Sequence, residues 1–126
     1  MSKRPFKTTV RLPPYRSTRT VWRKAIHQAV MERLAASGVE YTDKDRLALA
    51  VRLYFNEDLL EIVDVDNRLK DVMDALQGHV GGHGKKKRSL PPIIPNDNRV
   101  FRVIVEKSLA PKQSADGRGH LTITKY

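Results

Sequence analysis

The stretch Leu47–Phe55, LALAVRLYF, decides the fold class. It is a run of apolar and β-forming residues with a single charge, Arg52, and such a short run predicts a mostly buried strand. A connection, NEDLLEI, leads from it to the segment IVDVDNRLKDVMDAL at residues 62–76. That segment has the apolar spacing of an amphipathic helix. The pair therefore indicates a domain that combines sheet and helix.

The helix in residues 62–76 is predicted to begin at Asp64 or Asp66, because aspartate is a favoured N-cap residue. Its apolar residues recur at helical spacing and are Leu69, Val72, Met73 and Leu76. It is expected to run to about Gln77, where Gly78 follows. Glycine commonly adopts the left-handed conformation that ends a helix.

The remaining elements follow from the spacing of apolar residues, which is about 3.6 residues in a helix and 2 residues in a strand. Apolar residues at helical spacing from Val21 to Leu34, after cap candidates in STRT, predict a first helix that Gly38 ends. Alternation or β-forming content predicts four strands, which are Phe6–Leu12, Leu47–Phe55, Val100–Val105 and His120–Tyr126. The expected fold is a single α+β domain over residues 1–126 with a mixed β-sheet and two helices. Its order is β-α-β-α-β-β, with a long Gly- and Lys-rich loop at about 79–95.

Composition narrows the classes of function. The chain has no cysteine, which excludes disulfides and thiolate metal sites. No apolar run approaches the roughly 20 residues of a membrane span or follows the basic N-terminus as in a secretory signal. We therefore expect a cytoplasmic protein without a membrane partner. The formal net charge of +10 favours a polyanionic partner, and nucleic acid before an anionic membrane surface.

Acidic residues gather in the middle of this basic chain. Residues 1–41 carry net charge +7, residues 42–74 carry −4, and residues 75–126 carry +7. A protein that only binds nucleic acid gains nothing from an acidic centre, whereas an enzyme that holds a divalent cation against phosphate needs one. Asp64 and Asp66 are two residues apart, and in an extended segment their side chains would point to one side. With Asp97 as a third carboxylate they would suit Mg²⁺, which prefers oxygen ligands.

Each of these residues also has a structural interpretation. Two aspartates before a helix often cap it and interact with its dipole. Lys70 could neutralise charge that grows on a phosphate, yet it also lies four residues after Asp66, at the spacing of an ordinary helix ion pair. Asp74 is most simply a surface residue. Spacing alone leaves both interpretations open.

The segments DVDNRLKDVMDALQG and NDNRVFRVIVEK together resemble the RusA-type Holliday-junction endonucleases. The family pattern is D-x-D-N-x-x-K-x-x-x-D-x-L, followed after a short gap by an Asp and a strand. The match is strongest over residues 62–78 and 96–107. The resemblance implies a homodimeric, Mg²⁺-dependent crossover junction endodeoxyribonuclease of bacterial or phage origin, with Mn²⁺ as a substitute ion. Such an enzyme resolves four-way DNA junctions by paired symmetric nicks in recombination and repair and uses no small-molecule cofactor.

The resemblance also assigns roles to single residues. It implies that Asp64, Asp66 and Asp97 bind the metal, that Lys70 is catalytic or contacts phosphate, and that Asn67 and Asp74 support the site. The chain departs from the family in three places. It has Asn96-Asp97 where two acids are common, it lacks an asparagine in YRSTR, and its loop between Gly78 and Asn96 is longer. The longer loop bears on substrate preference more than on chemistry.

Two groups of basic residues are candidates for contact with DNA phosphates. They are Arg16, Arg19, Arg23 and Lys24 near the first helix, and Lys85, Lys86, Lys87 and Arg88 in the long loop. A solvated charge run is the alternative for the second group. His79 and His83 lack further ligands for a zinc site, and the spacing of Trp22 predicts a core residue. Two other functions remain open at this point, namely a non-catalytic basic nucleic-acid-binding protein and a nuclease for flaps or other branched DNA.

Overall fold

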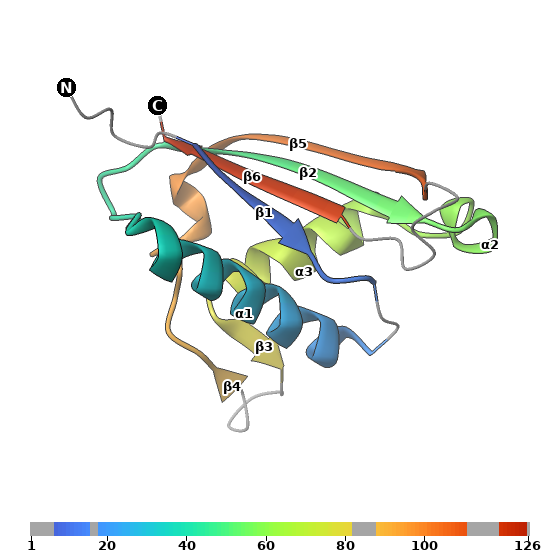
Figure 1. Ribbon diagram of the computed structural model, residues 1–126, viewed down its shortest axis with the longest axis horizontal. Coiled ribbons are helices and arrows are strands. Elements are labelled where there is room, and N and C mark those ends of the chain that lie inside the picture. The colour runs from blue at the N-terminus through green and yellow to red at the C-terminus, as the bar shows by residue number, and fades with distance from the viewer. Residues whose placement is uncertain (1–6, 16–17, 82–87, 111–118, 126) are drawn as a thin grey trace.

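Four strands form one mixed sheet, as the sequence predicts for an α+β fold (Figure 1). The structure is a computed structural model, and it describes residues 7–15, 18–81, 88–110 and 119–125. The strands are β1 (Lys7–Leu12), β2 (Leu47–Phe55), β5 (Val100–Leu109) and β6 (Gly119–Lys125). Their order across the sheet is β1-β6-β2-β5. β6 is antiparallel to both β1 and β2, whereas β5 is parallel to β2 and forms an edge.

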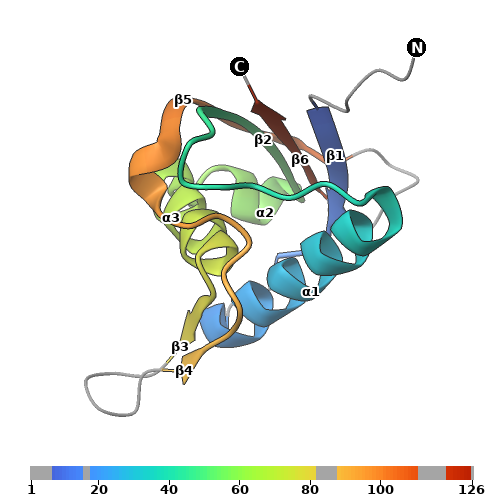
Figure 2. The ribbon, with the colours of Figure 1, turned by 90° about the vertical axis from the view of Figure 1, so that its left-hand side faces the viewer.

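Two longer helices, α1 (Arg19–Ser37) and α3 (Val65–Leu76), lie on one face of this sheet (Figure 2). α1 packs beneath β1 and α3 beneath β5, and the two helices also contact each other. A one-turn helix, α2 (Glu57–Leu60), joins β2 to α3, and a 3-10 turn, η2 (Asp97–Arg99), precedes β5. A short hairpin of β3 (His79–Gly81) and β4 (Arg88–Ser89) extends below the helices (Figure 1).

The core lies between the sheet and the helices. Alternate residues of β2 point toward the helices and are buried, and these are Leu47, Leu49, Val51, Leu53 and Phe55. Trp22, Ile26 and Val30 of α1 meet them and are fully buried, so the prediction of a core tryptophan is confirmed. The opposite face of the sheet carries the intervening residues of each strand. No helix of the described segments covers that face (Figure 1).

The predicted elements are present, with differences at their ends. β2 matches its predicted range, and Gly38 ends α1 in the left-handed conformation with a φ of 71°. β5 is longer than predicted and runs to Leu109, because the parallel ladder with β2 continues to that residue. Phe6 and Tyr126 lie outside the described residues. Val21 was expected on the apolar face of α1 but is 49% exposed, because that face is centred on Trp22 and Ile26.

The prediction of a loop over residues 79–95 is wrong for part of that segment. Its two ends pair as the hairpin of β3 and β4, and the residues between them lie outside the described part of the chain. After the hairpin the chain folds back over the end of α3. The amide of Leu90 donates to the Gly78 carbonyl at 2.8 Å, and the amides of Ile93 and Ile94 both donate to Leu76. His27 on α1 adds a 2.7 Å hydrogen bond to the Pro91 carbonyl.

We predict that Gly78→Ala destabilises the protein more than Gly38→Ala does. Both glycines have positive φ, so each substitution carries a cost of about 1 kcal/mol for backbone strain. A Cβ at Gly38 would meet nothing within 4 Å, whereas a Cβ at Gly78 would lie 2.1 Å from the Leu90 carbonyl oxygen. Urea unfolding should therefore show an additional loss of about 1–3 kcal/mol for Gly78→Ala. Equal losses for the two variants would contradict this close packing.

Candidate functional site

Asp64 and Asp66 lie at the exposed N-terminus of α3 and converge on Asn67. Asp64 is the N-cap residue, and Asp66 is in the first turn. The Asn67 side-chain amide donates to Asp64 Oδ2 at 3.3 Å, and the Asn67 backbone amide donates to Asp66 Oδ1 at 3.0 Å. The expectation that both carboxylates sit on an extended segment is wrong, because the helix already begins at Val65. Asn67, and not strand alternation, relates the two carboxylates.

Lys70 and Asp74 follow on successive turns of α3. Lys70 is exposed, and in the described segments it forms no ion pair with Asp66, so the structural interpretation of that spacing gains no support. Asp74 is not a free surface residue. Its Oδ2 lies 3.2 Å from an Arg23 nitrogen, and its side chain is 23% exposed.

Asp97 lies at the other end of α3. Its backbone amide donates to Gln77 Oε1 at 3.3 Å, and its side chain is exposed. Gln77 is eleven residues after Asp66, which corresponds to about 16 Å along a helix axis. Within one chain Asp97 is therefore separated from the pair at Asp64 and Asp66. In agreement, no three His, Asp or Glu side chains of the described residues come together as a metal site.

The Asp64–Asp66 pair suits part of the chemistry of Mg²⁺. This ion keeps several waters and often takes one or two carboxylates from the protein together with phosphate oxygens of a substrate. The pair is exposed and held by Asn67, which leaves room for such a ligand set. A site of three carboxylates does not fit within a single chain, because Asp97 is too distant.

A buried carboxylate, Asp71, joins the two helices and was not singled out as a site from the sequence. Its side chain is fully buried and accepts from Arg19 Nε and Arg23 Nε, each at 2.9 Å. Arg68 Nη2 lies 3.3 Å from its other oxygen. Together with Asp74, this arginine–aspartate cluster contains three arginines and two aspartates, so it retains an excess positive charge.

The cluster contains two arginines of the basic patch that the sequence predicts on the first helix. Arg19 and Arg23 both face Asp71, although the Arg19 side chain remains 44% exposed and that of Arg23 only 15%. Lys24 is exposed. Arg16, Lys85, Lys86 and Lys87 lie outside the described residues, and only the backbone of Arg88 is described. His79 is half-buried in β3, and His83 also lies outside the described segments.

Arg68 has a second role that sequence reasoning did not identify. Its guanidinium donates to the Tyr15 hydroxyl and lies 4.8 Å from the centroid of the Tyr15 ring, in a cation–π contact. The spacing along α3 already indicated that these charged residues share the buried face. The buried residues of α3 are Arg68, Asp71, Val72, Ala75 and Leu76. They follow an i, i+3, i+4, i+7 pattern. An apolar stripe alone does not reveal that two charged residues share it.

Asp45, Tyr41 and Arg52 have shifted pKa values. The Thr42 backbone amide, which donates to Asp45 at 2.7 Å, lowers the pKa of Asp45 despite some desolvation, and Lys125 contributes in the same direction. Burial raises the pKa of Tyr41. A hydrogen bond to Glu106 raises the pKa of Arg52 on the exposed face of the sheet. None of the three groups contacts the Asp64–Asp66 pair.

No protein-family model matches the chain, and no curated protein matches its sequence. None of the helices in the described segments is long and apolar enough to cross a bilayer. The functional interpretation of the candidate site therefore rests on its own residues and on their geometry.

We predict that Asp71→Asn strongly destabilises the fold. The substitution removes the charge that faces three arginines, two of which have side chains at most 15% exposed. Breaking one side of a buried charge cluster typically costs about 3–5 kcal/mol. The matched control is Asp74→Asn, which loses one partly exposed ion pair and should cost within about 1 kcal/mol. Similar unfolding free energies for the two variants in urea would contradict a central role for Asp71.

Proposed function

We propose that the protein is a Mg²⁺-dependent, structure-specific DNA endonuclease that acts as a homodimer on four-way junctions. The observation that carries the proposal is the exposed Asp64–Asp66 pair at the start of α3, joined by Asn67. It coincides with the segment that resembles the RusA-type family. The net charge of +10 supports a polyanionic substrate.

Four residues at the start of α3 would have different roles in the proposed reaction. Asp64 and Asp66 would hold the cation at the helix N-terminus, and Asn67 would orient both carboxylates through its two amide groups. A bound Mg²⁺ supplies a Lewis acid that polarises a phosphodiester and lowers the pKa of a bound water. Lys70, exposed one turn further along α3, would contact the phosphate and offset charge that develops on it.

Basic side chains of α1 would bind the DNA backbone. The partly exposed Arg19 belongs to the excess positive charge of the arginine–aspartate cluster, and Lys24 is exposed on the same helix. Phosphate contacts of this kind give affinity without sequence specificity and weaken with salt. A four-way junction has approximate two-fold symmetry, so a dimer with two-fold symmetry offers two sites in matching orientation for paired nicks.

We predict that Asp66→Asn abolishes junction cleavage and leaves junction binding intact or stronger. Loss of an outer-shell partner of a metal ligand already costs 10–100-fold, so loss of a ligand should reduce the nicking rate by at least about a hundredfold. Binding should persist because the substitution removes a negative charge that faces phosphate. A labelled four-way junction, incubated with Mg²⁺ or with EDTA, reports both quantities in cleavage and gel-shift assays.

Glu61→Gln is the matched control, because it removes one exposed carboxylate just before the motif. That variant should cleave like the wild type. Loss of binding and of folded structure in Asp66→Asn would indicate a structural aspartate. Absence of metal-dependent nicks in the wild type would favour a non-catalytic DNA-binding protein, and faster cleavage of flaps than of junctions would favour a nuclease for other branched DNA.

A further inference from the structure

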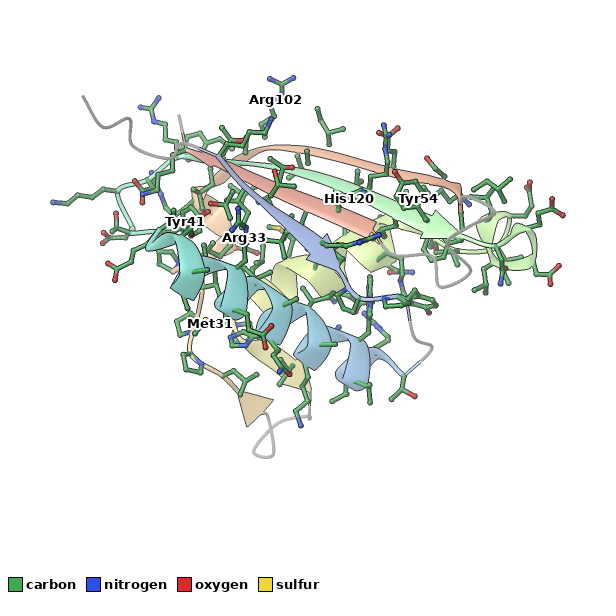
Figure 3. The ribbon with its side chains drawn as sticks, viewed as in Figure 1. Met31, Arg33, Tyr41, Tyr54, Arg102 and His120 are labelled. Atoms are coloured by element: carbon green, nitrogen blue, oxygen red, sulfur yellow. The ribbon has the colours of Figure 1, made fainter. Side chains whose placement is uncertain are left out.

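The face of the sheet that turns away from the helices carries rows of aligned side chains. We call it the open face, and it consists of every second residue from Lys7 in β1, Ala48 in β2, Arg102 in β5 and His120 in β6. The residues between them in β1, β2 and β6 are mostly buried against the helices. One row crosses all four strands and consists of Lys7, Thr124, Ala48 and Arg102. Figure 3 shows Arg102 extending from the sheet on the side without helices.

The open face is basic. Of its described residues, four are lysine or arginine and one is an acid, and these are Lys7, Arg11, Arg52, Arg102 and Glu106. Arg52 forms an ion pair with Glu106, so their formal charges cancel. Lys7 and Arg11 are exposed on the edge strand β1, and Arg102 is exposed on β5 at the other edge. Positive charge at both edges of one face favours a polyanionic chain that crosses it.

Two open hollows adjoin at the centre of the open face. The first has a volume of about 410 Å³, and its lining includes Ala48, Ile104 and Arg102. The second has a volume of about 260 Å³, and its lining includes Tyr54 and His120. Ile104 is 49% exposed and lines both hollows. Apolar side chains with a cation beside them suit flat rings that are joined to anionic groups, which is the composition of a nucleotide.

Tyr54 and His120 add aromatic surface to the second hollow. Their ring centroids are 5.7 Å apart in an edge-to-face contact at 89°. Tyr54 is partly exposed and His120 is exposed. Unstacked bases of a single strand stack readily on aromatic side chains, whereas the bases of a duplex are stacked on one another and leave only their edges accessible. The combination of aromatic, apolar and cationic groups therefore favours a single strand over a duplex.

We propose that the open face binds single-stranded nucleic acid, with one base in each hollow and with phosphates on Lys7, Arg11 and Arg102. The base in the second hollow contacts the rings of Tyr54 and His120. Such contacts accept any base, so the affinity depends on salt and on the presence of bases more than on their sequence. The candidate metal site belongs to α3, which lies on the other face of the sheet (Figure 2). The binding of a single strand therefore does not rest on the proposed function.

Two labelled strands of equal length separate base contacts from simple attraction between charges. One strand is an oligonucleotide of thymidines, and the other is its abasic analogue, which has the same phosphates but no bases. Fluorescence anisotropy of each strand with the full-length protein in EDTA measures binding without metal-dependent cleavage. The wild type should bind the thymidine strand at least about tenfold more tightly, because each stacked base typically contributes about fivefold or more. Equal affinity for the two strands would overturn the proposal.

Two substitutions of Tyr54 test the ring in the second hollow. Tyr54→Ala should weaken binding of the thymidine strand by about fivefold or more and leave binding of the abasic strand unchanged. Tyr54→Phe keeps the aromatic ring and should bind both strands like the wild type. Urea unfolding of both variants reports whether the fold is retained. An equal loss for the two strands in Tyr54→Ala would contradict a base stacked on this ring and overturn the proposal.

Neighbouring residues of β5 provide a matched pair of variants that locates the site on one face. Ile104→Glu places a carboxylate between the two hollows and should weaken binding of the thymidine strand by at least about tenfold. Val103→Glu is the control, because Val103 is 37% exposed but aligns with the buried Leu49 on the helix side of the sheet. It should bind the strand within about twofold of the wild type. Equal weakening by both substitutions would overturn the proposal.

Nicking of a four-way junction with Mg²⁺ reports separately on the proposed function. A wild type that prefers the thymidine strand but nicks no junction supports binding at the open face and contradicts the nuclease. A wild type that nicks junctions but binds both strands alike supports the nuclease and overturns binding at the open face. A second copy of the chain seated on this face would exclude the strand, and it would also overturn the proposal. In that case Ile104→Glu would dissociate the wild-type oligomer in analytical ultracentrifugation.

Discussion

The contact between Asp71 and the arginines of α1 and α3 is the constraint on which the arrangement of this protein depends. Hydrophobic burial places both helices on the sheet, but apolar packing is non-directional and tolerates rotation of a helix about its axis. A buried carboxylate that accepts from Arg19 and Arg23 at 2.9 Å permits much less freedom. The rotation of α3 determines where its first turn points. Asp71 therefore fixes the orientation of Asp64 and Asp66, although it lies more than a turn away from them.

Local periodicity in the sequence was sufficient for most of the fold. The run at Leu47–Phe55, the alternation before Pro13 and the glycine after α1 each follow from backbone sterics and from which face is buried. Local periodicity failed where contacts between distant parts of the chain determine the structure. The hairpin of β3 and β4 forms in a Gly-rich segment because the chain returns over α3, with Leu90 bonded to Gly78. The buried pair Arg68 and Asp71 was missed because each residue type is ordinarily a surface residue.

The candidate site shows the same division between local and distant information. Asn67 and Asp64 are three residues apart on a helix terminus, so their contact could be anticipated from the motif. The distance from Asp66 to Asp97 could not, because it depends on α3 running opposite to β5, with Lys107 of β5 bonded to Val63 before α3 and Asp97 bonded to Gln77 after it. Spacing along the chain predicts which residues share a helix turn but not which ends of two elements meet. A set of three carboxylates inferred from sequence therefore indicates which ligands a metal could use. Whether those ligands meet depends on the topology of the fold.

The acidic middle of a basic chain is consistent with that topology. Carboxylates that face phosphate repel it, so a chain with net charge +10 gains from concentrating them where a cation can intervene. Within one subunit the acids are divided between the two ends of α3, and most of their charge is exposed. A cation at Asp64 and Asp66 would offset this repulsion at the start of α3, and Arg99, two residues after Asp97, lessens it at the other end.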